Sequence, residues 1–288
     1  MSALHRLLSC ITLGCTLLLA ACGSGSTFEP LNPSRVISFG DGWSDLTPGA
    51  KMTVNDGTVN IWVERVATSY GKTITAQVSG GLGFAQNGAR ISGANSIANQ
   101  ITTFLAANTI GASDLLIIDA GVSELAALAI DPANATDSAL AIAADAAGRA
   151  LALQVLRLTA ANGKHVVIAN SPDLGKTPFA ATRGRAAGFT AATRAFNDGL
   201  KIGLANVTNS VLLIDNEAYV TTLYTTPSNL GGGGNATAVA CPGVASACTA
   251  ANANPSYGVY LFADDRHITP RAHNLLGENA YNKIKARW

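Results

Sequence analysis

The chain has few charged residues and no excess of either sign. Charged side chains make up 13% of its 288 residues, with 19 basic and 18 acidic residues, and the formal net charge at pH 7 is +1. Such a surface offers neither the basic patch that nucleic acids need nor an electrostatic attraction to membranes. Apolar residues make up 48% of the chain, which argues against a long disordered tract. We therefore expect a well-filled globular protein that does not bind nucleic acid.

The apolar run at the N-terminus is too short to span a membrane as a stable helix. It covers residues 7–19, follows the basic start His5-Arg6, and ends in Leu-Ala-Ala-Cys at residues 19–22. This tetrad resembles a bacterial lipobox, in which the cysteine is acylated and becomes the mature N-terminus. The alternative is an ordinary signal peptide cleaved at a small-residue site.

The lipobox interpretation predicts three parts of the chain. Residues 1–21 are a lipoprotein signal peptide, residues 22–34 a flexible tether with Cys22 as the lipid attachment site, and residues 35–288 one domain. The chain would then bind the membrane through this lipid anchor. Gly23 after the cysteine, where a retention signal would place Asp, suggests the outer membrane of a Gram-negative bacterium. We expect a monomer in the cell envelope.

Cysteine is scarce, and its five positions are explained by this processing. Cys10 and Cys15 leave with the signal peptide and Cys22 takes the lipid, so Cys241 and Cys248 remain as an even pair in an oxidising compartment. The pair predicts a disulfide. A metal site is disfavoured because no further His or Cys lies at metal-finger spacing, so we expect neither metal nor cofactor.

Strand and helix patterns alternate along the chain. Short apolar runs predict buried parallel strands at 36–39, 115–119, 166–169 and 211–214, with a weaker one near 73–78. Helices are predicted at about 59–69, 96–107 and 186–204, from Thr136 or Asp137 onward, and after Thr269 and Pro270. This alternation predicts a single three-layer α/β/α domain with a mostly parallel, doubly wound sheet. Residues 227–257 are predicted to be a long surface loop, either a lid over the site or a tolerated insertion.

Asp264 and His267, three residues apart near the C-terminus, have the spacing of a general base and its orienting acid. A neutral imidazole acts as a base at one nitrogen when its other nitrogen is held, and a carboxylate one turn earlier can hold it. This pair alone is weak evidence, because the spacing is common.

Three further blocks share the pattern of a known family. They are FGDGWSD at residues 39–45, GFAQNGAR at 83–90 and GVSE at 121–124. With the Asp264–His267 block they resemble the SGNH superfamily and its GDSL esterases and lipases, whose usual blocks read FGDSLSD, NYAQGGAR, GxND and DxxH. The resemblance covers nearly the whole mature chain. It implies a flavodoxin-like fold and ester hydrolysis, with His267 as base and Asp264 as the acid that orients it. The oxyanion donors would be the N–H groups of Gly42 and Gly88 and the side chain of Ser123.

Two of the four name-giving residues differ from the family. Gly42 stands at the nucleophile position and Ser123 replaces the asparagine that donates to the oxyanion. A glycine has no hydroxyl, so covalent catalysis through position 42 is excluded. Three hypotheses remain: a weakly active or inactive family member that keeps a pocket for an acyl ester or acylated carbohydrate, an active esterase that uses Ser44 or a water activated by His267, and a non-catalytic binding or structural lipoprotein.

Overall fold

The four predicted apolar runs form one parallel sheet. Its strands, in spatial order, are β1 (Val36–Gly40), β2 (Leu115–Asp119), β3 (His165–Ala169) and β4 (Val211–Ile214). β1 and β2 are buried along their whole length, which explains why their sequences are continuously apolar. The structure is a computed structural model that describes residues 29–58, 61–207 and 209–288, of which 32–287 form one compact unit. The predicted signal peptide and Cys22 lie outside the described residues.

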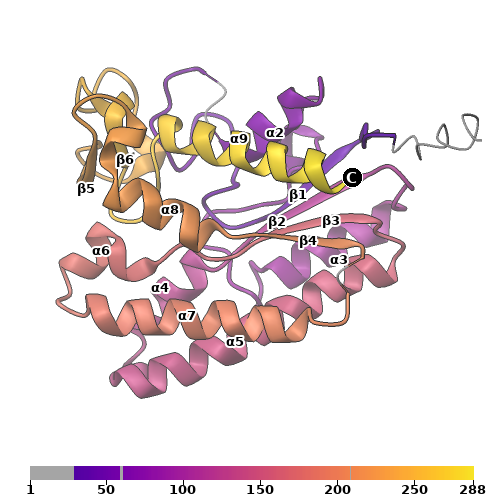
Figure 1. Ribbon diagram of the computed structural model, residues 1–288, viewed down its shortest axis with the longest axis horizontal. Helices are drawn as coiled ribbons and strands as arrows, with labels where there is room; N and C mark the ends of the chain where they lie inside the picture. The colour runs from indigo at the N-terminus through magenta and orange to yellow at the C-terminus, as the bar shows by residue number, and fades with distance from the viewer. Residues whose placement is uncertain (1–28, 59–60, 208) are drawn as a thin grey trace, which may run out of the picture. The chain divides into compact units, whose positions relative to one another are not determined.

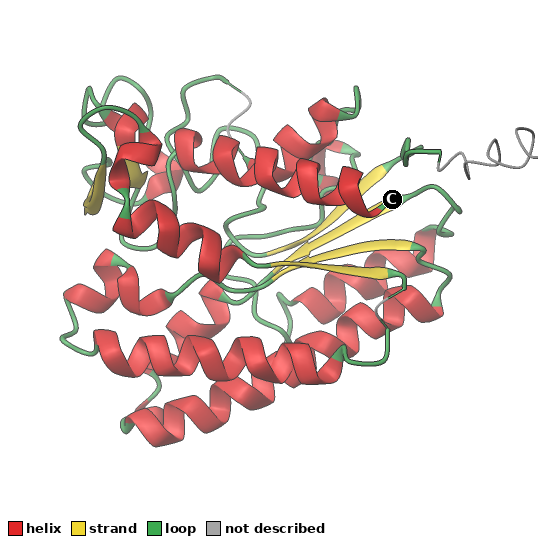
Figure 2. Ribbon diagram, viewed as in Figure 1, coloured by secondary structure: helices red, strands yellow, loops and turns green. Residues whose placement is uncertain are grey.

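Helices cover both faces of this sheet, as Figures 1 and 2 show. In Figure 1, α2 and α9 lie on one side of the strands, and α3, α4, α5 and α7 lie on the other. The helices are α2 (Trp62–Ser69), α3 (Ile97–Ala107), α4 (Val122–Ile130), α5 (Asp137–Ala160), α6 (Pro178–Ala181), α7 (Ala186–Gly203), α8 (Asn216–Thr225) and α9 (Pro270–Arg287). The predicted caps are present: Thr136 accepts the N–H of Ala139 at the start of α5. The three-layer α/β/α prediction is confirmed.

Two predictions about individual segments were wrong. The segment 73–78 is not a strand, because it makes a single bridge to the sheet region and then enters a 3-10 turn. The segment 227–257 is not a plain loop, because it contains β5 (Asn235–Val239), which pairs in parallel with β6 (Tyr260–Phe262). It also contains a disulfide between Cys241 and Cys248. This small two-stranded sheet gives the segment its own backbone hydrogen bonds.

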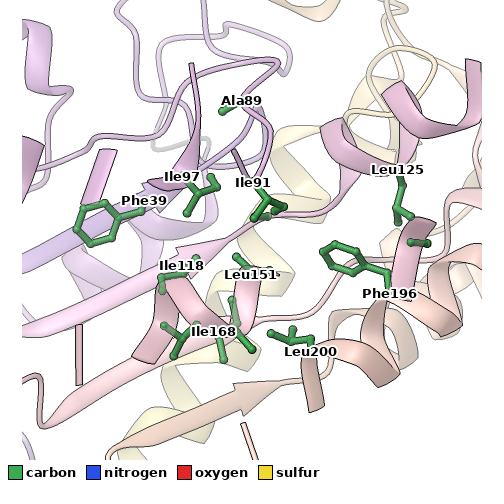
Figure 3. Close-up of a cluster of buried hydrophobic side chains, with 14 of the residues drawn as sticks. Phe39, Ala89, Ile91, Ile97, Ile118, Leu125, Leu151, Ile168, Phe196 and Leu200 are labelled. Atoms are coloured by element: carbon green, nitrogen blue, oxygen red, sulfur yellow. The ribbon is translucent and has the colours of Figure 1, made fainter. Parts of the chain in front are cut away.

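The main core lies between the sheet and the helices α3, α5 and α7. Figure 3 shows Phe39, Ile118 and Ile168 from three strands with Leu151 of α5 and Phe196 of α7, all of them buried. A Cβ on Gly148 of α5 would lie 2.0 Å from the carbonyl oxygen of Phe196, so the glycine allows the two helices to pack in contact.

The topology places a crevice at the carboxyl ends of β1 and β2. An extended segment at 82–86 continues the sheet on the free edge of β1, where Ser38 donates its N–H to Leu82 and accepts one from Phe84. The chain therefore leaves β1 toward one edge and later adds β2 on the other. In open α/β sheets, ligands bind at such a switch point, outside the carboxyl ends of the strands.

Candidate functional site

The chain makes a tight turn directly after β1. The carbonyl of Asp41 accepts the N–H of Ser44 at 3.1 Å, and one oxygen of the Asp41 carboxylate accepts the N–H of Trp43 at 3.2 Å. The next helix, α2, begins only at Trp62. Gly42 therefore lies in a single turn and not in the first turn of a helix.

His267 lies in the loop between β6 and α9 and is held by Asp264. Its Nδ1 is 2.8 Å and 2.9 Å from the two carboxylate oxygens of Asp264, and its backbone N–H donates to the same carboxylate at 2.8 Å. Ala245 adds a third N–H to Asp264 at 3.0 Å. Burial tends to raise the pKa of the Asp264 carboxyl, but the hydrogen bonds and charge of His267 outweigh it and lower this pKa to about 2. Asp264 is thus an ionised acceptor that fixes the imidazole and leaves Nε2 for the site.

The imidazole of His267 lies against Gly42. A Cβ built on Gly42 would be 2.6 Å from Nε2 of His267 and 2.8 Å from Oδ1 of Asn87. Both distances are shorter than real Cβ contacts, so a serine at position 42 would need one or both neighbours to move. The structure therefore brings Gly42, Asp264 and His267 together, and the ring occupies part of the space that a serine side chain needs.

Asn87 is a site residue that the sequence analysis did not single out. Its backbone N–H donates to Asp45 at 2.8 Å, which fixes the loop, while its side chain lies beside Gly42. The signal was present in the GFAQNGAR block, where Asn87 stands at a position that is usually glycine in the family pattern. The next residue, Gly88, has φ of +76°, a left-handed conformation that favours glycine, and lines the pocket described below.

Ser123 follows β2, and its polar groups serve Asp41. Its backbone N–H donates to the Asp41 carboxylate at 2.9 Å. Burial raises the pKa of the Asp41 carboxyl, and the N–H and hydroxyl of Ser123 oppose that rise. Ser123 lines the pocket beside Gly88, but its hydrogen bonding ties the β2 loop to the β1 turn.

Ser44 lies on the side of the turn that faces the core. Its hydroxyl donates to Asp119 at 3.1 Å and accepts the indole N–H of Trp62 at 2.9 Å, and its side chain is fully buried. Trp62 also donates to Asp119 at 3.0 Å. Burial and then the negative charge of Asp41 raise the pKa of the Asp119 carboxyl. Neither Asp119 nor its network with Ser44 was anticipated from the sequence.

Trp43 and His273 are core residues at the back of the site. The indole N–H of Trp43 donates to the carbonyl of Arg266 at 3.1 Å, and its ring packs edge-on against His273. His273 is completely buried on α9, and burial lowers its pKa to about 3, so its imidazole is neutral. Trp43 is buried and fills the core behind the site.

A cavity of about 670 Å³ opens over His267 and Gly88. Its polar part is formed by residues from the three loops already described, together with the Asp265–Arg266 pair. Its apolar wall comes from the helix α4, from Met52 and from residues 239–248, which contain the Cys241–Cys248 disulfide and are named the disulfide segment. The apolar side chains that line it are Met52, Ala126, Ala127, Ile130, Val239 and Val244. The volume is within the usual range for a small-molecule site.

The disulfide segment shapes one side of this cavity. Cys241 and Cys248 are joined by a bond of 2.06 Å, as predicted, and the loop between them supplies Val244 to the wall and the N–H of Ala245 to Asp264. The side-chain amide of Asn55 donates to the carbonyl of Cys248 at 3.1 Å and so fastens the loop to the body of the domain. Within the described residues, no cluster of three His, Cys, Asp or Glu side chains could hold a metal ion.

Comparison with known proteins gives one family model and several similar solved structures. The family model described as GDSL-like lipase/acylhydrolase matches residues 36–280. A lipolytic protein of the G-D-S-L family from Veillonella parvula is 15% identical, with 86% of this chain and 96% of that chain covered and a TM-score of 0.47. A carbohydrate acetylesterase from Sinorhizobium meliloti is 14% identical, with 88% and 99% covered and a TM-score of 0.49. Phospholipase A1 from Streptomyces albidoflavus is 13% identical, with 87% and 98% covered and a TM-score of 0.45. No curated protein sequence matches the chain.

Proposed function

Because this chain belongs to the GDSL-like lipase/acylhydrolase family, we propose that it derives from an ester hydrolase and is weakly active or inactive. It keeps a pocket for an acyl ester or an acylated carbohydrate. One observation carries this proposal: His267 is held by Asp264 as a base would be, yet its Nε2 faces Gly42, which has no hydroxyl to activate. Removing the nucleophile of a serine hydrolase costs on the order of a millionfold in turnover.

Ser44 is a poor substitute for the missing nucleophile. A nucleophile has to contact its base, whereas the Ser44 hydroxyl contacts Asp119 and Trp62 and is buried away from solvent. Moving it to His267 would break its hydrogen bonds to Asp119 and Trp62 in the core, and only the direct bond between those two side chains would remain.

A second candidate function is slow hydrolysis by water, and the intact Asp264–His267 pair favours it. Nε2 would take a proton from a water molecule, the resulting hydroxide would attack the ester carbonyl, and the same proton would pass to the leaving alkoxide. The N–H groups of Gly42 and Gly88 would stabilise the negative oxygen of the intermediate. This route lacks the acyl-enzyme intermediate of a serine hydrolase, so any activity is expected to be low.

Ester hydrolysis assays separate these functions. We expect negligible hydrolysis of nitrophenyl butyrate by the chain carrying Cys22→Ser, which removes the acylation site without shortening the protein. A low rate that is lost in His267→Ala and kept in Ser44→Ala would identify the water route. A high rate that Ser44→Ala abolishes, and that Ser79→Ala at an exposed control position leaves intact, would overturn the proposal.

We also propose that the protein is a lipoprotein anchored through Cys22 in the outer membrane of a Gram-negative bacterium. The Leu-Ala-Ala-Cys tetrad at residues 19–22 and the Gly-Ser run after it support this. Cells given radioactive palmitate should label the wild-type protein but not Cys22→Ser. Label in both proteins would contradict the anchor.

A further inference from the structure

Several polar groups around Gly42 and Gly88 do not serve the fold. Among the hydrogen bonds of the described residues, none uses the N–H of Gly42, the N–H of Gly88 or the side-chain amide of Asn87. The amide oxygen Oδ1 of Asn87 and Nε2 of His267 lie 2.8 Å and 2.6 Å from the point where a Cβ of Gly42 would be. By contrast, Ser123, which stands at the position of the family's amide donor, is engaged with Asp41.

The arginine charges around the pocket are already paired. Arg90 forms an ion pair with Glu124, and Arg266 pairs with Asp265. The ionised Asp264 holds Nδ1 of His267. An anion that enters the pocket therefore needs a new positive charge. His267 can supply it by taking a proton on Nε2, because Nδ1 is already held. The other titratable groups facing the ring are Asp41 and the neutral, buried His273.

The apolar wall continues outward from these donors. Ile130, Val239 and Val244 line the pocket and are exposed by 62%, 40% and 63%. Three of the seven large apolar side chains that are exposed in the described residues thus surround one cavity. Exposed apolar side chains grouped around a cavity mark a binding surface.

We propose that this pocket binds free aliphatic carboxylic acids, with the carboxylate at Asn87, Gly88 and His267 and the chain along Ile130, Val239 and Val244. The proposal rests on the proposed function, since it assumes that the hydrolase pocket is kept while turnover is lost. Asn87 then takes the role of the side-chain amide donor, delivered from the loop after residues 82–86 instead of the loop after β2.

A carboxylate fits these groups better than an ester does. It has two oxygens that accept several hydrogen bonds, whereas an ester carbonyl is one neutral acceptor. The Asn87 side chain can present its NH₂ group to the ligand by rotating its amide. No serine hydroxyl projects from position 42, so the carboxylate can approach the backbone of the turn. The carboxylate binds together with one proton on Nε2, which leaves the net charge of the pocket unchanged.

Calorimetric titration with decanoate tests this proposal. The protein is the chain with Cys22→Ser, and decanoate is kept well below micelle-forming concentrations. We expect decanoate to bind at least tenfold more tightly than decanol or methyl decanoate, and Asn87→Leu to weaken decanoate binding at least tenfold. Asn206→Leu, an exposed asparagine in the loop before β4 at the opposite edge of the sheet, is the matched control and should have no effect.

Proton uptake gives a second, independent readout. Titrations at pH 8 in buffers of different ionisation enthalpy should show uptake of about one proton per decanoate, and His267→Gln should abolish it. Equal binding of decanol and decanoate would show that only the chain is recognised and would overturn the proposal. Absence of binding, or decanoate binding unchanged in Asn87→Leu, would also overturn it. The hydrolysis assay tests the proposed function separately, because a high esterase rate would refute that function whatever the result with decanoate.

Discussion

At the residue scale, Gly42 and Asn87 share one space. Position 42 carries no side chain, and the amide oxygen of Asn87 lies 2.8 Å from the point where a Cβ of residue 42 would be. A side chain introduced at position 42 therefore meets Asn87.

This arrangement predicts the outcome of restoring the nucleophile. Gly42→Ser should raise the hydrolysis of nitrophenyl butyrate only slightly, because its Cβ meets Nε2 of His267 at 2.6 Å and Oδ1 of Asn87 at 2.8 Å. Displacing a catalytic group by about 1 Å costs roughly a hundredfold. Adding Asn87→Gly frees one side of the serine, so we expect kcat/KM of the double variant to exceed that of Gly42→Ser about tenfold or more.

Asn87→Gly alone is the control for this experiment, and it should stay as inactive as the parent chain. A double variant no more active than Gly42→Ser would mean that the ring of His267, and not Asn87, blocks the serine. A fully active Gly42→Ser would show that both neighbours move at little cost.

At the scale of elements, the disulfide segment links the small sheet to the site. Its loop contributes Val244 to the pocket and the N–H of Ala245 to Asp264, and Asn55 ties it to the domain. Loss of the covalent link should therefore reduce stability and loosen the pocket together.

The variant Cys241→Ala/Cys248→Ala should lower the free energy of unfolding by about 2 to 3 kcal/mol, the usual effect of closing a short loop. Urea denaturation followed by fluorescence measures this change. Dithiothreitol should destabilise the parent chain by a similar amount and leave the double variant unaffected. A parent chain that is insensitive to dithiothreitol, or an equal response of both proteins, would contradict the assigned role of the disulfide.

The helices and strands that were predicted correctly are those whose hydrophobic pattern in the sequence matches the burial of their side chains in the structure. The strands β1 to β4 are continuous apolar runs because both faces of the sheet are covered. The helices α5 and α9 begin directly after Thr136 and Thr269, which are the capping residues expected at helix starts. α4 was not predicted because it is almost entirely apolar and buried on several sides, so it shows no helical stripe. β5 was not predicted because its pairing with β6 depends on a partner more than twenty residues away.

Of the site, the sequence predicted the contacts between residues close in the chain and missed those between distant residues. Asp264 and His267 are close in sequence, so a motif can reveal their contact. Asn87 meets Gly42 and Asp119 meets Ser44 across long sequence separations, and only the packing of separate loops brings them together. Their roles could not be read from spacing.

At the scale of the whole molecule, buried ionisable groups make stability depend on pH. Burial and the charge of Asp41 raise the pKa of Asp119 to about 8, well above the value of about 3.9 of an exposed aspartate. Between these two values the folded state keeps a proton that the unfolded state has released. Rising pH therefore favours unfolding through Asp119. Buried His273 acts in the opposite direction below about pH 6.5, because only its unfolded form is then protonated.

Comparing Asp119→Asn with wild type isolates the contribution of Asp119. The amide is nearly isosteric, does not titrate, and offers an oxygen that can accept the hydrogen bonds from Ser44 and Trp62. The free energy of unfolding of the variant, relative to wild type, should increase by about 3.5 kcal/mol as the pH rises from 5 to 8. Urea denaturation at a series of pH values measures this difference, and Asp198→Asn at a mostly exposed position should show no such increase. A difference that is constant across this range would mean that Asp119 is ionised in the folded protein, and the buried network would then have to stabilise two carboxylates.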